Sequence, residues 1–336
     1  MSQGREQDSF WRGRRVFITG CTGFLGSWLT AALLERGAAV VGLIRMREPE
    51  SQLIRTGLIG KIEQVYGDLL DYELIKHTLV DKDIDTVFHL AGQTIVGVAN
   101  REPAATFETN IRGTWLLLEA VRHTPSVRGV VVASSEKAYG EHKTLPYLEE
   151  LPLQGRHPYE VSKSCADLIA QSFAHTYGLA IAVTRCSNLF GGGDLSWNRL
   201  IPGTIRSVLS GEQPVIRSDG SFRRDYLYVA DAVRGYLMLA EKLTDVGVRG
   251  EPFNFGSGCA VSALEVVRTI VALSGSPALE PVILNEVKNE ILDEFLSPAK
   301  AKQAIGWRPQ YTLAGGLKET MAWYKAYLDT WIAPAS

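Results

Sequence analysis

Short apolar runs recur along the first half of the chain, and each is followed by a stretch with helical spacing. The runs lie at residues 15–19, 39–44, 62–66, 84–90, 128–134 and 179–185. Apolar runs of this length are typical of strands. Their alternation with helices predicts an α/β fold, a Rossmann-like doubly wound parallel sheet.

The texture changes after residue 186, where glycine and proline separate shorter elements. We expect residues 1–185 to form the Rossmann domain, with elements returning to it at about 226–258. Residues 186–225 and 259–330 are then expected to form a smaller C-terminal α/β region that binds a substrate.

Three glycines, Gly20, Gly23 and Gly26, stand between the first apolar run and a helix that begins near Ser27. Glycines at this place let backbone N–H groups approach a pyrophosphate at the N-terminus of the helix. A tight strand-to-helix turn without a ligand is the alternative. The strand before the loop and the helix after it favour a nucleotide diphosphate site.

The ends of the second and third strands add candidate contacts, because ligands of such sheets bind beyond the carboxyl ends of the strands. The second strand ends without the Asp or Glu that would hold a ribose 2′-hydroxyl; Arg45 or Arg47 either meets a 2′-phosphate or is simply solvated. Asp68 either accepts from an adenine amino group or caps the helix expected at 72–80.

Tyr159 and Lys163 lie one turn apart on a helix expected to start near Pro158, so their side chains share a face. A nearby ammonium favours the phenolate and makes tyrosine a usable base. The same spacing occurs in the pairs Tyr72/Lys76 and Tyr139/Lys143. Tyr72 lies upstream of the polar strand end 134–137, and Gly140 after Tyr139 disfavours a helix there. Only Tyr159 therefore stands on a helix after this strand end, which can supply a hydroxyl to it.

Composition narrows the function classes. A net charge of −2 with 21% charged residues gives no electrostatic reason to expect nucleic acid or an anionic membrane as partner. The four cysteines show no paired short spacing, so we expect neither a metal site nor a disulfide framework. The polar start of the chain and the lack of a long apolar run predict a cytoplasmic protein without a membrane span.

These motifs together resemble the extended short-chain dehydrogenase/reductase superfamily, and the resemblance covers nearly the whole chain. It rests on the glycine loop, His89-Leu-Ala-Gly92, Asn110, Ser135 and the Tyr159/Lys163 pair. Within the superfamily, the segments 10–20, 26–29, 191–194 and 198–202 are similar to nucleotide-sugar 4,6-dehydratases, above all to the CDP-glucose branch.

The resemblance implies NAD as cofactor, with NADP left open by Arg45, and a nucleotide-diphosphate sugar as substrate. The cofactor contacts it implies are Gly20, Gly23, Phe24, Leu25, Gly26, Arg45, Asp68, Leu69, Leu90, Ala91, Gln93, Asn110, Tyr159 and Lys163. The substrate contacts it implies are Asn188, Asn198, Arg217 and Arg224. It also implies a homodimer, or a dimer of dimers, built on the helices at 101–122 and 158–177.

The implied reaction oxidises the sugar at C4, eliminates water across C5 and C6, and returns hydride to C6. Tyr159 takes the proton of the 4-hydroxyl, Lys163 favours its phenolate, and Ser135 hydrogen-bonds the same hydroxyl. Glu136 and Lys137 occupy the two positions that carry the acid/base work of elimination.

Glu136 departs from the family's pattern, which usually has Asp there. The extra methylene moves the carboxyl by about 1.5 Å, and misplacement by about 1 Å can cost on the order of 100-fold in rate. A neutralising Glu136/Lys137 pair at a strand end is the structural alternative. The functional alternatives are a nucleotide-sugar 4-epimerase, which needs no such pair, and a non-catalytic cofactor-binding protein.

Overall fold

A parallel sheet of seven strands forms the centre of the molecule in the computed structural model, which describes residues 10–275, 278–286 and 291–331. The strand order is β11-β6-β5-β4-β1-β2-β3. The strands are β1 (Arg15–Thr19), β2 (Ala39–Ile44), β3 (Glu63–Tyr66), β4 (Thr86–His89), β5 (Gly129–Ala133), β6 (Ile181–Cys186) and β11 (Pro252–Phe255).

This sheet confirms the predicted Rossmann-like fold, and each of the six apolar runs contains one of its strands. The segment at 252–255 returns to the sheet as its seventh strand, as expected. The other segment that was expected to return does not join the central sheet at its start. There, β10 (Tyr226–Tyr228) pairs with β7 (Asn188–Phe190) in a separate sheet. Residues 1–9 of the expected first domain lie outside the described residues.

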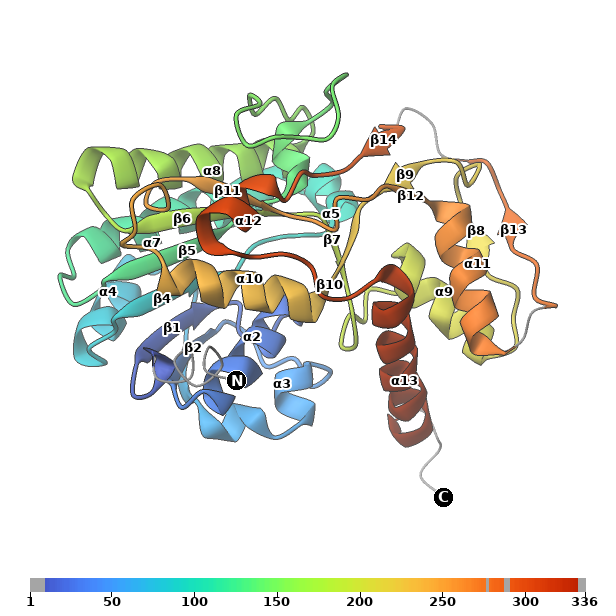
Figure 1. The fold of residues 1–336 in the computed structure, drawn as a ribbon. Helices are drawn as coiled ribbons and strands as arrows, with labels where there is room; N and C mark the ends of the chain where they lie inside the picture. Colours follow the sequence, from blue (N-terminus) through green and yellow to red (C-terminus); the bar gives the residue numbers. More distant parts are fainter. Residues whose placement is uncertain (1–9, 276–277, 287–290, 332–336) are drawn as a thin grey trace.

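Helices cover both faces of the sheet (Figure 1). Successive residues of β1 pack on opposite faces of the sheet. Val16 and Ile18 belong to a buried hydrophobic cluster on one face, and Phe17 belongs to a second cluster on the other face. On the first face lie α2 (Phe24–Glu35) and α10 (Val229–Glu241). On the second face lie α4 (Tyr72–Asp81), α7 (Gly113–Arg122) and α8 (Pro158–Tyr177).

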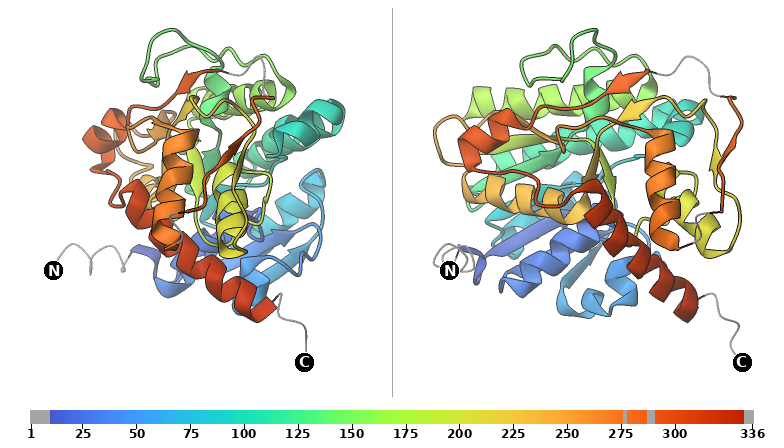
Figure 2. Two further views of the ribbon diagram at one scale, coloured as in Figure 1. Left: turned by 90° about the vertical axis from the view of Figure 1, so that its right-hand side faces the viewer. Right: turned by 45° about the vertical axis from the view of Figure 1, so that its right-hand side comes forward.

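A smaller lobe of short strands and helices lies beyond the carboxyl ends of β5 and β6 (Figures 1 and 2). A three-stranded sheet pairs β12 (Val261–Ser262), β9 (Arg223–Arg224) and β14 (Asp293–Glu294), and β8 (Val215–Ile216) pairs with β13 (Val282–Ile283). The helices of the smaller lobe are α9 (Leu200–Leu209), α11 (Ala263–Ser274) and α13 (Leu313–Trp331).

Short helical segments complete the described chain and connect the larger elements. They are α3 (Gln52–Arg55), η1 (Leu58–Lys61), α5 (Val96–Arg101), α6 (Pro103–Phe107), η2 (Glu108–Arg112), η3 (Glu136–Tyr139) and α12 (Ala299–Ile305). Among the described residues, no helix has the length and apolar character that a membrane crossing requires.

Candidate functional site

A cavity of about 840 Å³ opens at the carboxyl ends of the central strands. Its walls come from the β1–α2 turn, the ends of β4 and β5, the start of α8 and the segment from β7 to α9. The sheet order reverses between β1 and β4, and this switch point is where doubly wound sheets bind their ligands. The volume lies within the ~300–1,000 Å³ range of ligand pockets.

The β1–α2 turn needs glycine at two of the predicted positions. Gly20 has φ +75°, and a Cβ there would lie 2.8 Å from the Ala91 nitrogen. A Cβ at Gly26 would lie 2.0 Å from the carbonyl oxygen of Gly20. The two glycines therefore leave the backbone of the turn without side chains where it borders the cavity. This geometry admits a diphosphate.

The next two strand ends bring Arg45 and Asp68 to the cavity wall, both of them exposed. Asp68 accepts a hydrogen bond from the backbone N–H of Leu70, with a distance of 2.9 Å. It does not cap the following helix, because Asp71 is the N-cap of α4 and accepts from Leu74. The capping alternative for Asp68 is therefore wrong, and its carboxylate stays at the edge of the cavity.

Asn110 lies behind the cavity wall, on the π-helical turn η2. Its side-chain oxygen accepts from the Gln93 N–H at 2.7 Å, and its amide donates to the Gln93 carbonyl at 3.0 Å and to Ser162 Oγ at 2.9 Å. Asn110 thus fixes the backbone that follows β4. The cavity itself is lined by Gln93 and not by Asn110.

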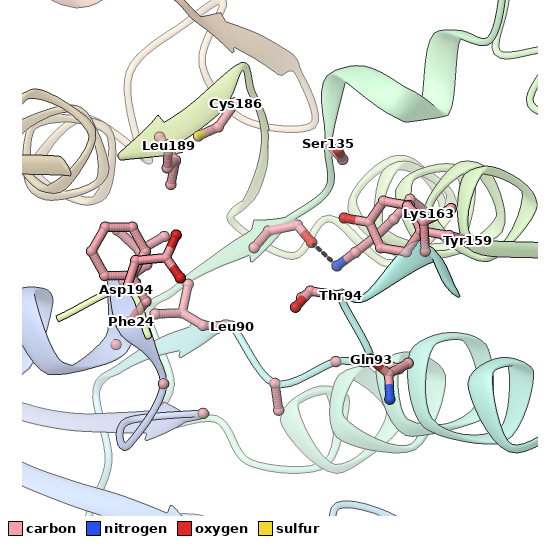
Figure 3. A pocket seen from close by; sticks show the side chains of 18 of the residues that line it. Phe24, Leu90, Gln93, Thr94, Ser135, Tyr159, Lys163, Cys186, Leu189 and Asp194 are labelled. Atoms are coloured by element: carbon pink, nitrogen blue, oxygen red, sulfur yellow. Dashed lines mark hydrogen bonds between the residues drawn. The ribbon is translucent and has the colours of Figure 1, made fainter. Parts of the chain in front are cut away.

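Tyr159 and Lys163 project from α8 into the cavity on the same face, as Figure 3 shows together with Ser135. The helix begins at Pro158, and the Glu160 carboxylate accepts from the His157 N–H at 3.2 Å, so Tyr159 falls in the first turn. Tyr159 is 8% exposed, and Ser135 lies close enough to its phenol to influence its pKa.

Burial governs the pKa values of this pair. It raises the pKa of Tyr159 above its usual value, although the nearby Ser135 hydroxyl opposes the shift. It lowers the pKa of Lys163 to about 8. The Lys163 ammonium donates to the Ala133 carbonyl at 2.9 Å. The expected stabilisation of the phenolate by Lys163 therefore does not dominate here, because desolvation of the phenol outweighs it.

Glu136 is 2% exposed and directly follows Ser135 at the end of β5. Its Oε1 accepts from the Asn188 amide at 2.6 Å, whereas Oε2 has no hydrogen-bond partner among the residues that the structure describes. Burial and the nearby Glu294 carboxylate raise the pKa of Glu136 well above its usual value. A carboxyl group with a raised pKa on a cavity wall is a candidate for proton transfer.

Lys137 forms an ion pair with Glu294 of β14, a residue that sequence reasoning missed. Burial alone would lower the pKa of Lys137, but Glu294 and Glu136 outweigh it, and the pKa is raised. The ammonium is therefore the form present near neutral pH. Glu136 and Lys137 both line the cavity, so the two residues to which the resemblance gives acid/base work lie on one wall.

Comparisons with known proteins show to which family the chain belongs. The family model described as GDP-mannose 4,6 dehydratase matches residues 17–320. The chain belongs to this family. A CDP-glucose 4,6-dehydratase of Salmonella typhimurium is 32% identical over 95% of this chain and 93% of its own. A dTDP-glucose 4,6-dehydratase of Xanthomonas campestris is 29% identical over 94% of each chain.

Solved structures agree with the fold. A UDP-glucose 4-epimerase from Thermotoga maritima, with UDP-glucose, has a TM-score of 0.86 and 28% identity over 94% of this chain and 99% of that one. A dTDP-glucose 4,6-dehydratase double mutant from Streptomyces venezuelae, with NAD and DAU bound, has a TM-score of 0.85 and 27% identity over 95% and 99%.

The cavity brings together most of the residues that were predicted from the sequence. The lining includes Ser135, Glu136, Lys137, Tyr159, Lys163, Asn188, Arg224 and every predicted cofactor contact except Asn110. Asn198 and Arg217 do not line it, and both are exposed. Arg199, which follows Asn198, lies on the wall instead and pairs with Asp194 at 3.0 Å. Only its position beside Asn198 could have indicated it.

Proposed function

We propose that the protein is a nucleotide-sugar 4,6-dehydratase, most similar in type to CDP-glucose 4,6-dehydratase. One observation carries this proposal: Ser135 and Tyr159, which oxidation at C4 needs, share one cavity wall with Glu136 and Lys137, which elimination needs. The family to which the chain belongs and the similarity to a CDP-glucose 4,6-dehydratase support the same reaction.

The cavity fits NAD as the cofactor. A Cβ at Gly26 would meet backbone at 2.0 Å, and one at Gly20 at 2.8 Å, so the turn is shaped for a diphosphate. The predicted cofactor contacts that line the cavity would hold the dinucleotide, and Asn110 would act through Gln93. When bound, the nicotinamide supplies a hydride acceptor and donor. Arg45 at the end of β2 keeps NADP as the alternative.

Ser135 and Tyr159 act on the 4-hydroxyl. We assign Tyr159 as the group that takes its proton, because the phenol faces the cavity from the first turn of α8. Ser135, which lines the same cavity, would hold the same oxygen. Lys163, one turn further along α8, would hold ribose hydroxyls and favour the phenolate once charged.

Glu136 and Lys137 divide the elimination. The raised pKa of Glu136 makes its carboxylate a stronger base, and we assign it to the C5 proton, which a C4 ketone acidifies. Lys137 is held as an ammonium, and we assign it as the acid that protonates the departing 6-hydroxyl. The buried Oε2 of Glu136, without a partner in the described residues, is the oxygen available for this work.

The substrate would lie over β7 and β9. Asn188 and Arg224 line the cavity and are proposed contacts of the sugar diphosphate. Asn198 remains a proposed contact of the nucleotide portion and Arg217 of the phosphates, although both lie off the cavity wall. The expected division at residue 186, between a cofactor region and a substrate region, agrees with this placement.

Location and assembly complete the proposal. We propose a cytoplasmic enzyme, on the balanced charge and on the cysteine pattern of the sequence. We also propose that it forms a homodimer, or a dimer of such dimers, through the helices within 101–122 and 158–177. Trp115 on α7 and Leu168 on α8 are 39% and 56% exposed, which supports a contact there.

A 4-epimerase is the second candidate. Its support is the similarity to the UDP-glucose 4-epimerase structure and the contact of Asn188 with Glu136, which occupies one carboxylate oxygen. Epimerisation requires the Ser135–Tyr159 pair but no acid/base pair for C5 and C6.

Product mass separates the two candidates. The protein is incubated in turn with CDP-, dTDP-, UDP- and GDP-glucose, and the products are analysed by mass spectrometry. We expect loss of one water, with CDP-glucose the best substrate. An isomer of unchanged mass would replace the dehydratase proposal with the epimerase.

A further inference from the structure

The carboxylate of Glu294 lies behind the proposed acid/base pair and has no assigned role. It is fully buried, on the short strand β14 of the smaller lobe. One oxygen, Oε2, forms an ion pair with Lys137 and lies 3.7 Å from the Arg224 Nε. Glu294 therefore reaches from the smaller lobe to the end of β5, where η3 begins.

A buried carboxylate is unfavourable unless nearby cations offset the free-energy cost of taking its charge out of water. Two cations, Lys137 and Arg224, share its Oε2. Its Oε1 has no partner among the described residues. Both cations line the cavity while Glu294 does not, so the carboxylate acts from behind the wall.

The charged surroundings of this cluster come from several elements. Glu136 and Lys137 belong to η3, Arg224 to β9, and Asp225 follows Arg224. Tyr147 faces Glu294 from the loop before α8. Asp225 is tied by hydrogen bonds to Ser257.

We propose that Glu294 is a positioning residue of the elimination step, which fixes the Lys137 ammonium beside Glu136 so that the two act as one proton-transfer pair. This inference rests on the proposed function. A purely structural carboxylate would only join the lobe to the sheet. Glu294 differs because its ion-pair partner is itself on the cavity wall and adjacent in sequence to Glu136.

The negative charge of Glu294 acts on both members of the pair in the same direction. Glu294 is the second cause, after burial, of the raised pKa of Glu136. It also raises the pKa of Lys137, where burial acts in the opposite direction. If Glu136 is the base and Lys137 the acid, water loss rises with pH as Glu136 ionises and falls as Lys137 loses its proton. Removing the charge should move both limbs to lower pH.

The test compares Glu294→Gln, which removes the charge at nearly constant shape, with Glu294→Asp, which keeps the charge on a shorter side chain. The pH dependence of kcat for water loss is measured for each. We expect Glu294→Gln to move both limbs to lower pH by about one unit. We expect Glu294→Asp to keep the limbs in place and to lower the maximum, because Lys137 is drawn away from Glu136.

Oxidation at C4 is measured separately with CDP-6-deoxyglucose, which has no 6-hydroxyl to lose, in a single turnover. Glu294→Gln should leave this rate within about threefold of wild type, because Ser135 and Tyr159 do not contact the substituted side chain. Thermal melting reports folding. Glu251→Gln is the matched control: it breaks the 2.7 Å ion pair to Lys300 and should leave the pH profile unchanged.

A Glu294→Gln profile that overlays the wild-type profile, or one that only falls in height, would overturn the positioning role while leaving the dehydratase proposal intact. Equal loss of C4 oxidation and water loss would also overturn it. Failure of the wild-type protein to release water from any nucleotide sugar would instead overturn the proposed function, and with it this inference.

Discussion

The phenol of Tyr159 faces the cavity near Ser135, and burial keeps its pKa high. Replacing Tyr159 with Phe removes the only atom of this side chain that can move a proton. We expect turnover to fall by about 10²–10⁴-fold, the usual contribution of a general acid or base, with the cofactor still bound. Steady-state kinetics and cofactor titration by fluorescence measure the two effects.

Tyr72→Phe is the control, because Tyr72 has the same spacing to Lys76 but lies away from the cavity lining. It should retain wild-type turnover. Substantial residual turnover in Tyr159→Phe would contradict the assigned role, whereas a comparable loss in both variants would point to an effect on folding.

Glu136 links activity to stability through its buried carboxyl. Its pKa is raised in the folded state, so the folded protein binds the proton more tightly, and this contribution is lost as pH rises through the folded-state pKa. Glu136→Gln should therefore raise the free energy of unfolding more at pH 8 than at pH 5, by about 1.4 kcal/mol for each pKa unit of the shift.

The same variant should release water far more slowly, while it still oxidises CDP-6-deoxyglucose at C4. Denaturant unfolding at the two pH values and product analysis measure the two effects. Equal stabilisation at both pH values would show that folding does not raise the pKa of Glu136, and an equal loss of both reactions would remove it from the elimination step.

Local motifs allowed several site residues to be predicted, whereas residues brought in by distant segments were missed. Tyr159, Lys163 and Ser135 stood out because spacing and strand ends indicate them directly. Glu294 carried no signal, since it follows Lys137 by 157 positions and meets it only through β14. The raised pKa of Tyr159 also required the structure, because burial cannot be read from helical spacing.

The β1–α2 turn is the element on which cofactor binding depends. A Cβ at Gly26 would lie 2.0 Å from the Gly20 carbonyl oxygen, so Gly26→Ala must displace the turn. We expect cofactor affinity to fall at least about tenfold, since the diphosphate loses aligned N–H donors. Isothermal titration with NAD measures this.

Gly60→Ala is the matched substitution, because a Cβ at Gly60 meets no atom within 4 Å. It should bind NAD like the wild type, and circular dichroism should show both variants folded. Unchanged affinity in Gly26→Ala would mean that the turn does not hold the diphosphate.

Long elements were predictable and short ones were not. Apart from the edge strand β3, which is mostly exposed, the strands of the central sheet are largely buried on both faces, so hydrophobic runs located them. By contrast, β10 and β14 are three and two residues long, and their pairing depends on contacts across the fold. The smaller lobe, built largely from such elements, was therefore expected only as a region.

At the scale of the whole molecule, the smaller lobe brings β7, β9 and the start of α9 over the carboxyl ends of the sheet, so one cavity holds both halves of the proposed chemistry. The Gly20–Gly26 turn and the Glu136/Lys137 pair lie on its wall. Enclosing both in one cavity allows oxidation, elimination and reduction to follow each other without release of the sugar.

The central claim is that hydrogen removed from C4 returns to C6 after water has left. The direct measurement uses CDP-glucose carrying deuterium at C4, with the position of the label in the product read by NMR. We predict a 4-keto-6-deoxy sugar that has lost one water and carries the deuterium at C6. A product that keeps both the water and the deuterium at C4, with inverted configuration there, would contradict the account.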